Sequence, residues 1–156
     1  MSRKSKALVI GALAVLSLPL ALFGSLSLFS RKPENLGVTN GHLADCPATP
    51  NCVSSQATDP AHRMDAISFN NSPEEAMSRL KAIIANWPRT KIVTSDDRYI
   101  HAEFTSLLFR FVDDVEFLID PATKQIHFRS ASRTGKSDLG VNRQRMTSIC
   151  EQFAKH

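Results

Sequence analysis

The stretch RFVDDVEFLIDPATKQIHFRSASRTGKSDLGVN, residues 110–142, decides the predicted fold. Apolar and polar residues alternate over residues 111–120 and again over residues 125–131, which is typical of β-strands with one buried face. Pro121-Ala-Thr-Lys124 lies between them and has the composition of a tight turn. The two strands are therefore expected to form an antiparallel hairpin, followed by a glycine-containing loop and the start of the last helix.

The alternation also predicts the register of this hairpin. Two apolar pairs align the strands across a four-residue loop: Ile119 with Ile126, and Phe117 with Phe128. A slip by one residue would place apolar side chains opposite polar ones along both strands. The same register places Glu116 directly opposite Arg129, so we expect a cross-strand ion pair there.

An amphipathic helix is predicted after Ser72. Ser72-Pro-Glu-Glu75 is a capping box, with Pro73 at the first helical position. The apolar residues that follow share one helical stripe: Ala76, Met77, Leu80, Ile83, Ile84 and Trp87. Pro88 ends the helix, and the stripe is expected to pack on the core.

Shorter strands and a final helix complete the predicted domain. Residues 66–69 are expected to form an edge strand, and residues 91–94 and 99–104 two further strands. The last helix is expected to begin near Ser137 or Asp138. Its apolar stripe would comprise Leu139, Met146, Ile149, Cys150 and Phe153, with Cys150 a buried free thiol.

The order of these elements predicts the fold class. Helices with one apolar stripe and strands that are apolar on one side imply an α+β domain. In it, two helices cover one face of an antiparallel sheet of four to five strands. The β-α-β4-α order is that of each half of TATA-box-binding protein, an analogy of fold that carries no function.

The amino terminus predicts a transmembrane helix. Ala7 to Phe29 is a run of 23 residues without a charge, and such a helix can cross a hydrocarbon core of about 30 Å. Basic residues flank it: Arg3, Lys4 and Lys6 before, Arg31 and Lys32 after. This distribution favours a cytoplasmic amino terminus and an outer domain. An uncleaved signal anchor is favoured because the run exceeds the usual signal-peptide core, and a cleaved signal peptide is the alternative.

Between this segment and the folded domain lies an extended lead-in, rich in Pro, Asn, Thr, Ser and Gly. It contains Cys46-Pro-Ala-Thr-Pro-Asn-Cys52, which would close a disulfide loop in an oxidising compartment, stabilising the fold by about 2–3 kcal/mol. A structural metal held by the thiols with His42 or His62 is the alternative, although the spacing is wider than in zinc knuckles. The predicted organisation is a basic amino terminus and membrane segment (1–32), the lead-in (33–65) and the α+β domain (66–156).

The formal net charge of +4 comes from the residues that flank the apolar run. Without those five basic residues, 14 Lys+Arg stand against 15 Asp+Glu. The domain therefore lacks a general basic footprint, and no nucleic-acid partner is expected. The sequence also has no glycine-rich phosphate loop, nucleophile elbow or His-x-x-x-His motif, so no cofactor or metal is predicted.

Several strings in the chain carry a family resemblance. They are Asn35-Leu-Gly-Val38, Cys46-Pro47, Pro50-Asn-Cys-Val-Ser-Ser55, Phe111-Val-Asp-Asp-Val-Glu-Phe117, Arg129-Ser-Ala-Ser-Arg133 and Ser137-Asp-Leu-Gly-Val-Asn-Arg143. In this order they resemble the motifs of domain-of-unknown-function family 1499 (DUF1499), from Asn35 to about Phe153. The resemblance implies a bacterial or plastid protein with a membrane or export segment, and a cysteine segment that belongs to the domain. It transfers no catalytic residue, because the family has no established activity.

The polar face of the predicted sheet is the first candidate site. It carries Tyr99, His101, Glu103, Asp114, Glu116, His127 and Arg129. Histidines and carboxylates together can bind a metal or perform acid–base chemistry. In that case the catalytic candidates are His101, Glu103, Glu116 and His127. The favoured alternative is a solvated face with ordinary cross-strand ion pairs.

The basic loop after the hairpin is the second candidate site. Its basic residues are Arg129, Arg133, Lys136, Arg143 and Arg145, of which the first four are the ligand-binding candidates. They lie near a predicted helix amino terminus, which suits a phosphate or a carboxylate, including a lipid head group. The favoured alternative is an internal network in which Asp113 and Asp114 pair with Arg133 or Arg143. Asp113 interrupts an apolar face, and a buried carboxylate needs a partner.

The connection containing Leu107-Leu-Phe109 is expected to tuck into the core, with a lipid or partner contact as the alternative. Taken together, these features favour a binding or accessory domain for an anionic ligand or an envelope partner. It would be anchored in the bacterial cytoplasmic membrane by a single span and face the periplasm. The alternative function is a metal-assisted or acid–base hydrolase that uses the polar sheet face.

Overall fold

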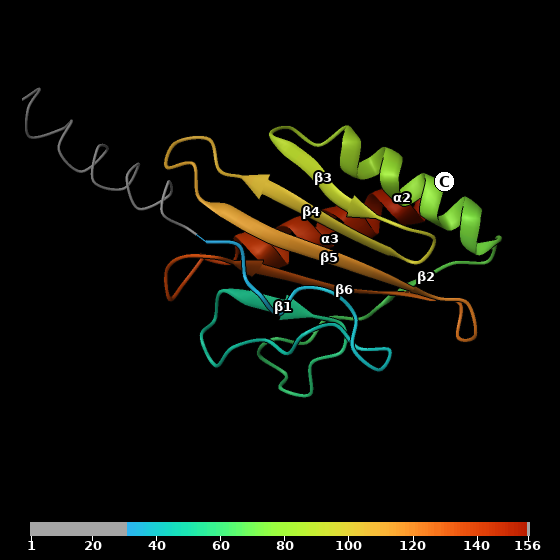
Figure 1. Ribbon diagram of the computed structural model, residues 1–156, viewed down its shortest axis with the longest axis horizontal. Coiled ribbons are helices and arrows are strands. Elements are labelled where there is room, and N and C mark those ends of the chain that lie inside the picture. Colours follow the sequence, from blue (N-terminus) through green and yellow to red (C-terminus); the bar gives the residue numbers. More distant parts are fainter. Residues whose placement is uncertain (1–30, 156) are drawn as a thin grey trace, which may run out of the picture.

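The computed structural model describes residues 31–155, which form an antiparallel sheet with two helices on one face (Figure 1). The strands are β1 (Cys52–Ser54), β2 (Ile67–Ser68), β3 (Thr90–Ser95), β4 (Tyr99–Thr105), β5 (Val112–Asp120) and β6 (Gln125–Ser132), and the helices are α2 (Pro73–Ala85) and α3 (Val141–Ala154). The sheet order is β1-β6-β5-β4-β3, and β2 also pairs with β6. The predicted α+β class is confirmed, with six strands rather than four to five.

The β5–β6 hairpin has the predicted register. Ile119 pairs with Ile126 and Phe117 with Phe128, across the four-residue turn between Asp120 and Gln125. The aligned positions alternate between the two faces of the sheet, so one set of apolar side chains packs under the helices. The apolar alternation was therefore a sufficient signal for this pairing.

The main core lies between the sheet and the two helices. Its fully buried members from β4, β5 and β6 are Ile100, Ala102, Val115, Phe117, Ile119, Ile126 and Phe128. Helix α2 begins as predicted: Ser72 accepts a hydrogen bond from the Glu75 amide, and the Glu75 side chain accepts one from the Ser72 amide. The stripe on α2 then packs on these strands.

Helix α3 begins later than predicted, at Val141. Asp138 Oδ1 accepts from Gly140 N at 3.1 Å and Oδ2 from Asn142 N at 2.7 Å, so this carboxylate turns the chain before the helix begins. Leu139 and Gly140 both have positive φ, +55° and +82°. Leu139 is 94% exposed rather than a member of the core stripe, because it lies in the turn.

The lead-in covers the face of the sheet opposite the helices. β1 lies within it and pairs with β6, with Ser54 opposite Arg129. Leu43 is buried with Tyr99 and Leu118 in a second, smaller apolar cluster on this face. Figure 1 shows the lead-in running along β1 on this side of the sheet. The prediction of a solvated polar face is therefore wrong.

Two further expectations concern apolar segments. No helix among residues 31–155 is long and apolar enough to cross a membrane; the predicted span at residues 7–29 lies outside the described residues. Leu107 and Leu108 are 66% and 71% exposed. The prediction that they tuck into the core is therefore wrong.

Candidate functional site

Glu116 lies at the centre of the covered sheet face and is fully buried. Its Oε1 accepts hydrogen bonds from the Tyr99 hydroxyl and the Gly37 amide, each at 2.7 Å. Its Oε2 lies 3.3 Å from Arg129 Nη1, which confirms the predicted ion pair. Burial, and then the hydrogen bond to Glu116, raise the pKa of Tyr99, so the phenol stays protonated and donates. The carboxylate thus connects three strands with the lead-in.

A second cluster lies beside it, around Asp114. His101 Nε2 lies 2.7 Å from Asp114 Oδ1, and Arg133 donates from Nε and Nη2 to the two carboxylate oxygens at 2.8 and 2.7 Å. Arg133 Nη2 also lies 2.5 Å from Glu103 Oε1. Burial alone would raise the pKa of Asp114, but the hydrogen bonds from Arg133 and His101 outweigh it and lower that pKa. Asp114 is therefore a buried, ionised anchor.

The favoured internal network is thus present, with one difference in its pairing. Asp114 pairs with Arg133 as expected, whereas Asp113 points to the helix side and pairs with Arg145, whose Nη2 lies 2.5 Å from Asp113 Oδ2. The Arg145 guanidinium also lies over the Phe104 ring, 4.9 Å from its centroid. Arg143 instead donates to the carbonyl oxygens of Ala61 and Arg63.

Asn142, at the start of α3, joins this helix side to the lead-in. Its Nδ2 donates to Asn51 O at 3.1 Å and to Ser132 Oγ at 3.0 Å, while its Oδ1 accepts from Ser130 Oγ at 2.6 Å. The side chain is fully buried. The sequence analysis missed Asn142 and Asn51, although both lie in strings that carry the family resemblance. Their arrangement is that of a structural network.

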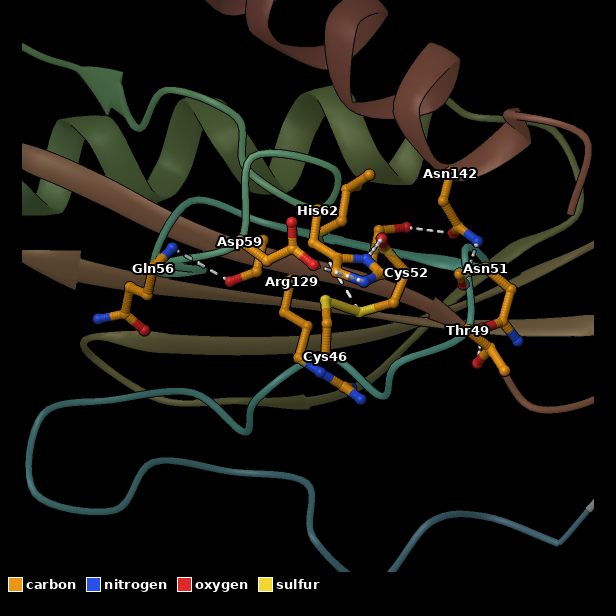
Figure 2. The surroundings of a disulfide bond; sticks show 12 residues. Cys46, Thr49, Asn51, Cys52, Gln56, Asp59, His62, Arg129 and Asn142 are labelled. Carbon is orange, nitrogen blue, oxygen red and sulfur yellow. Dashed lines mark hydrogen bonds and ion pairs between the residues drawn. A yellow bond between two sulfur atoms is a disulfide. The ribbon is translucent and has the colours of Figure 1, made fainter. Parts of the chain in front are cut away.

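The predicted disulfide is confirmed and holds the lead-in against the sheet. Cys46 and Cys52 are joined by an S–S bond of 2.05 Å, so neither thiol is left to bind a metal. His62 donates from Nδ1 to the Cys52 carbonyl oxygen at 2.9 Å, and Arg129 also belongs to the surroundings of the bridge (Figure 2). Among residues 31–155, no three His, Cys, Asp or Glu side chains are grouped to hold a metal ion.

The structure does not bring the four predicted ligand-binding residues together. Arg129 and Arg133 pair with buried carboxylates, and Arg143 binds carbonyl oxygens. Lys136 is exposed, and within the described part of the chain its side chain has no ion pair or hydrogen bond. The helix amino terminus expected to attract an anion is already occupied by the Asp138 carboxylate.

The four catalytic candidates are also dispersed. His101 and Glu116 are each at most 1% exposed and are held by other side chains. Glu103 pairs with Arg133. Of the four, His127 lines the cavity described below, while the other three are held in the contacts just given, so the four side chains do not converge on a common substrate position.

His127 lines a pocket that combines basic and apolar side chains, which we call the histidine pocket. It has a volume of about 550 Å³, and the lining residues used below are Val38, His42, Arg98, Tyr99, Leu118 and His127. His42 comes from the lead-in, Arg98 from the β3–β4 turn and His127 from β6. Ser55 Oγ lies 3.3 Å from His127 Nδ1 and thereby orients the ring.

Charge in the histidine pocket depends on the His127 imidazole. Burial lowers the pKa of His127, the Asp120 carboxylate opposes that shift, and His42 lowers the pKa further. Asp96 and Asp120 also line the pocket, but both accept hydrogen bonds within their own turns, Asp96 from Tyr99 N at 2.8 Å and Asp120 from Ala122 N at 2.9 Å. The Arg98 side chain makes no hydrogen bond or ion pair to residues 31–155. Three nitrogen-bearing side chains, His42, Arg98 and His127, therefore face a ligand in this pocket.

Comparison with known proteins gives a single family. The sequence model of a family described as "Protein of unknown function (DUF1499)" matches residues 42–153. No curated protein and no solved structure is found to match the chain. The matched segment includes His42, the disulfide, the side chains of both carboxylate clusters, and all the described strands and helices except the last residue of α3.

Proposed function

Since the chain belongs to the DUF1499 family, whose description names no activity, we propose a function from the geometry of the pocket. The protein is a membrane-tethered binding domain, and its histidine pocket holds a small molecule with a carboxylate and an apolar part. The observation that carries this proposal is the meeting of His42, His127 and Arg98 in one pocket from three separate segments.

The donors in the pocket suit a carboxylate. Arg98 presents a guanidinium that can bind two carboxylate oxygens at once, and each imidazole adds one N–H. With neutral imidazoles, Asp96 and Asp120 outweigh the single charge of Arg98. Protonation of His127 offsets this excess of negative charge, so we expect binding to strengthen as the pH falls.

The rest of the lining suits an apolar group. Val38 and Leu118 border the pocket beside the ring of Tyr99, whose hydroxyl is already committed to Glu116. A pocket of about 550 Å³ lies within the usual range of about 300–1,000 Å³ for small-molecule sites. The ligand therefore has a polar end toward His42, His127 and Arg98 and an apolar end toward Val38 and Leu118.

The disulfide and the amino terminus support an extracytoplasmic location. Disulfides persist in oxidising compartments and are uncommon in the cytosol, and Cys46–Cys52 holds the segment that supplies His42. The uncharged run at residues 7–29 provides the tether. In this proposal the domain faces the outer side of the cytoplasmic membrane, as an accessory or carrier domain.

The two site hypotheses drawn from the sequence remain predictions with less support. An anion site at Arg129, Arg133, Lys136 and Arg143 would have to use guanidinium groups that already bind carboxylates or carbonyl oxygens. A hydrolase using His101, Glu103, Glu116 and His127 would need substrate access to side chains that the lead-in covers. No contact in the described residues favours either over the histidine pocket.

A thermal-shift screen of the purified protein tests this proposal. Carboxylates of increasing chain length are compared with their neutral amides, for the natural protein, for Arg98→Gln and for Lys136→Gln. We expect carboxylates to raise the melting temperature more than amides, with the gain lost in Arg98→Gln and kept in Lys136→Gln. Equal loss in both variants would contradict the proposal, and loss only in Lys136→Gln would assign the anion site to the basic loop instead.

A further inference from the structure

Exposed apolar side chains gather at one end of the domain. Six large apolar residues of the described chain are exposed, and four of these lie in or next to two connections: Leu107, Leu108, Leu139 and Val141. Leu107 and Leu108 belong to the β4–β5 connection, residues 106–111. Leu139 lies in the β6–α3 connection, residues 133–140, and Val141 directly follows it. This clustering calls for an explanation, because solitary exposed apolar residues are ordinary but a group of them is not.

The two connections are neighbours in space. Arg133 N donates to Val112 O at 3.1 Å, which joins the start of the 133–140 connection to the first residue of β5, directly after the 106–111 connection. Ser106 and Val141 line the same groove, of about 340 Å³. Figure 1 shows both connections at the same end of the long axis, opposite the β5–β6 turn.

Each connection is held in a defined shape that points its leucines outward. Ser106 N donates to Phe111 O, and Phe111 N donates to Ser106 Oγ, both at 2.9 Å. These two bonds close residues 106–111 into a loop, and Leu107 and Leu108 lie within it. Leu139 has a φ of +55°, a conformation that costs free energy for a branched side chain. The Asp138 carboxylate holds this turn through Gly140 N and Asn142 N. The exposure of these leucines is therefore built into the backbone.

The chain enters the domain at this same end. In Figure 1 the first described residues, drawn in blue from residue 31, lie at the end that carries both connections. The preceding residues include the 23-residue run without a charge that ends at Phe29. Only Ser30 separates that run from Arg31, so a membrane that holds the run lies within a few residues of this end of the domain.

The charge at this end also fits a membrane surface. Arg31, Lys32 and Lys136 are exposed and outnumber the exposed Glu34. Asp138, the acidic residue of the 133–140 connection, already binds two backbone amides. Exposed leucines beside basic side chains are typical of segments that enter the boundary between head groups and acyl chains.

We propose that this end of the domain lies on the lipid bilayer, with Leu107, Leu108 and Leu139 inserted among the lipids and the basic residues at the head groups. The inference rests on the tether of the proposed function and not on the histidine pocket. It gives the domain a fixed orientation on the membrane, with the β5–β6 turn directed away from the lipid.

The test uses the full chain, one copy per nanodisc, in phosphatidylcholine and phosphatidylglycerol, with the Cys46–Cys52 bridge intact. In a Cys150→Ser background, an environment-sensitive fluorophore is attached at Leu108→Cys, at Leu139→Cys and, as the control, at Ala122→Cys in the β5–β6 turn. Lipids that carry a nitroxide near the head group then quench any fluorophore that touches the bilayer. We expect quenching at positions 108 and 139 to be several times that at position 122.

A companion variant distinguishes contact of the leucines with lipid from contact with protein. Leu107→Glu with Leu108→Glu should lower the quenching of the fluorophore at position 139, because both connections approach the bilayer together. Equal quenching at positions 108, 139 and 122 would overturn the proposal. So would a blue-shifted fluorophore at 139 that nitroxide lipids do not quench, since that result assigns the leucines to a contact within the same chain. Ligand-induced thermal shifts measured on the same variants report separately on the histidine pocket.

Discussion

Glu116 and Arg129 face each other across the β5–β6 hairpin, with Arg129 Nη1 lying 3.3 Å from Glu116 Oε2 and both side chains buried. The pair is covered by the lead-in, whose Gly37 amide donates to the same carboxylate. The Glu116 carboxylate therefore helps to hold the lead-in against the sheet. This arrangement connects the stability of the sheet to the position of His42, which the lead-in carries into the histidine pocket.

Replacing Glu116 by Gln should destabilise the protein strongly. The change removes the negative charge and leaves the Arg129 guanidinium buried without its counter-ion, a situation that costs about 3–5 kcal/mol. Urea unfolding followed by circular dichroism measures the free energy of unfolding. Adding Arg129→Met should recover part of the loss, because the double variant has no buried charge at this position.

The matched control for that pair is Glu151→Gln, which removes an exposed carboxylate from α3. Its effect should stay within about 0.5 kcal/mol. If Glu116→Gln lowered the free energy of unfolding as little as this control, the Glu116–Arg129 pair would contribute little to stability. Water would then reach the covered face more than the structure implies.

Removing the disulfide should loosen the lead-in. Replacing Cys46 and Cys52 by Ala opens a short loop, which by the chain-entropy relation costs about 2 kcal/mol. Hydrogen exchange should rise most at the Gly37 and Ser55 amides, which donate to Glu116 and to Phe128 O. Exchange at Phe117, in the centre of β5, serves as the internal control. A uniform rise across the domain would show that the bridge stabilises the whole fold rather than the lead-in.

Asp114 should make the protein sensitive to acid. Its pKa in the folded state is lowered below the unfolded value of about 3.9, so its stabilisation is complete above that value and is lost as the pH falls through the folded pKa. Unfolding measured from neutral to acidic pH should give a flatter profile for Asp114→Asn. Asp97→Asn, at an exposed turn position, is the control and should keep the natural slope.

Asn142 should tolerate no apolar replacement. Asn142→Leu leaves the buried Ser130 hydroxyl without its acceptor and removes one of the two donors to Asn51 O. It also takes a partner from Ser132 Oγ and from Arg145 Nη1, and an unsatisfied buried group costs about 1–3 kcal/mol. Differential scanning calorimetry should show a large drop in melting temperature. The control is Asn86→Ala, at the exposed end of α2, where the side-chain amide makes none of the contacts of Asn142. This change should have little effect on the melting temperature.

Local patterns explain the parts of the fold that the sequence predicted. The register of β5 and β6 follows from the apolar period of two, and the start of α2 from the capping box at Ser72. The start of helix α3 was predicted too early, because the apolar stripe of the helix extends back to Leu139 in the sequence. In the structure, Asp138 and Gly140 form a turn before the helix begins. A carboxylate two residues before a glycine was the signal that could have revealed this.

The candidate site depended on contacts that no local pattern contains. The lead-in has no apolar periodicity, so its sequence does not predict that it packs on β5 and β6. The polar face of the sheet was therefore expected to be exposed to solvent. For the same reason His42 could not be associated with His127, although His127 itself was singled out. The cysteine pair was the one local feature that pointed to a fixed lead-in.

The most direct test of the account is the pKa of His127, followed by NMR through the pH dependence of its imidazole resonances. The titration is repeated with hexanoate and with its neutral counterpart hexanamide, for the natural protein and for Arg98→Gln. We predict that hexanoate raises the pKa of His127 from its lowered value, that hexanamide leaves it unchanged, and that Arg98→Gln weakens the response. A His127 pKa that hexanoate does not move, at concentrations where the protein binds it, would place the ligand elsewhere and contradict the proposed function.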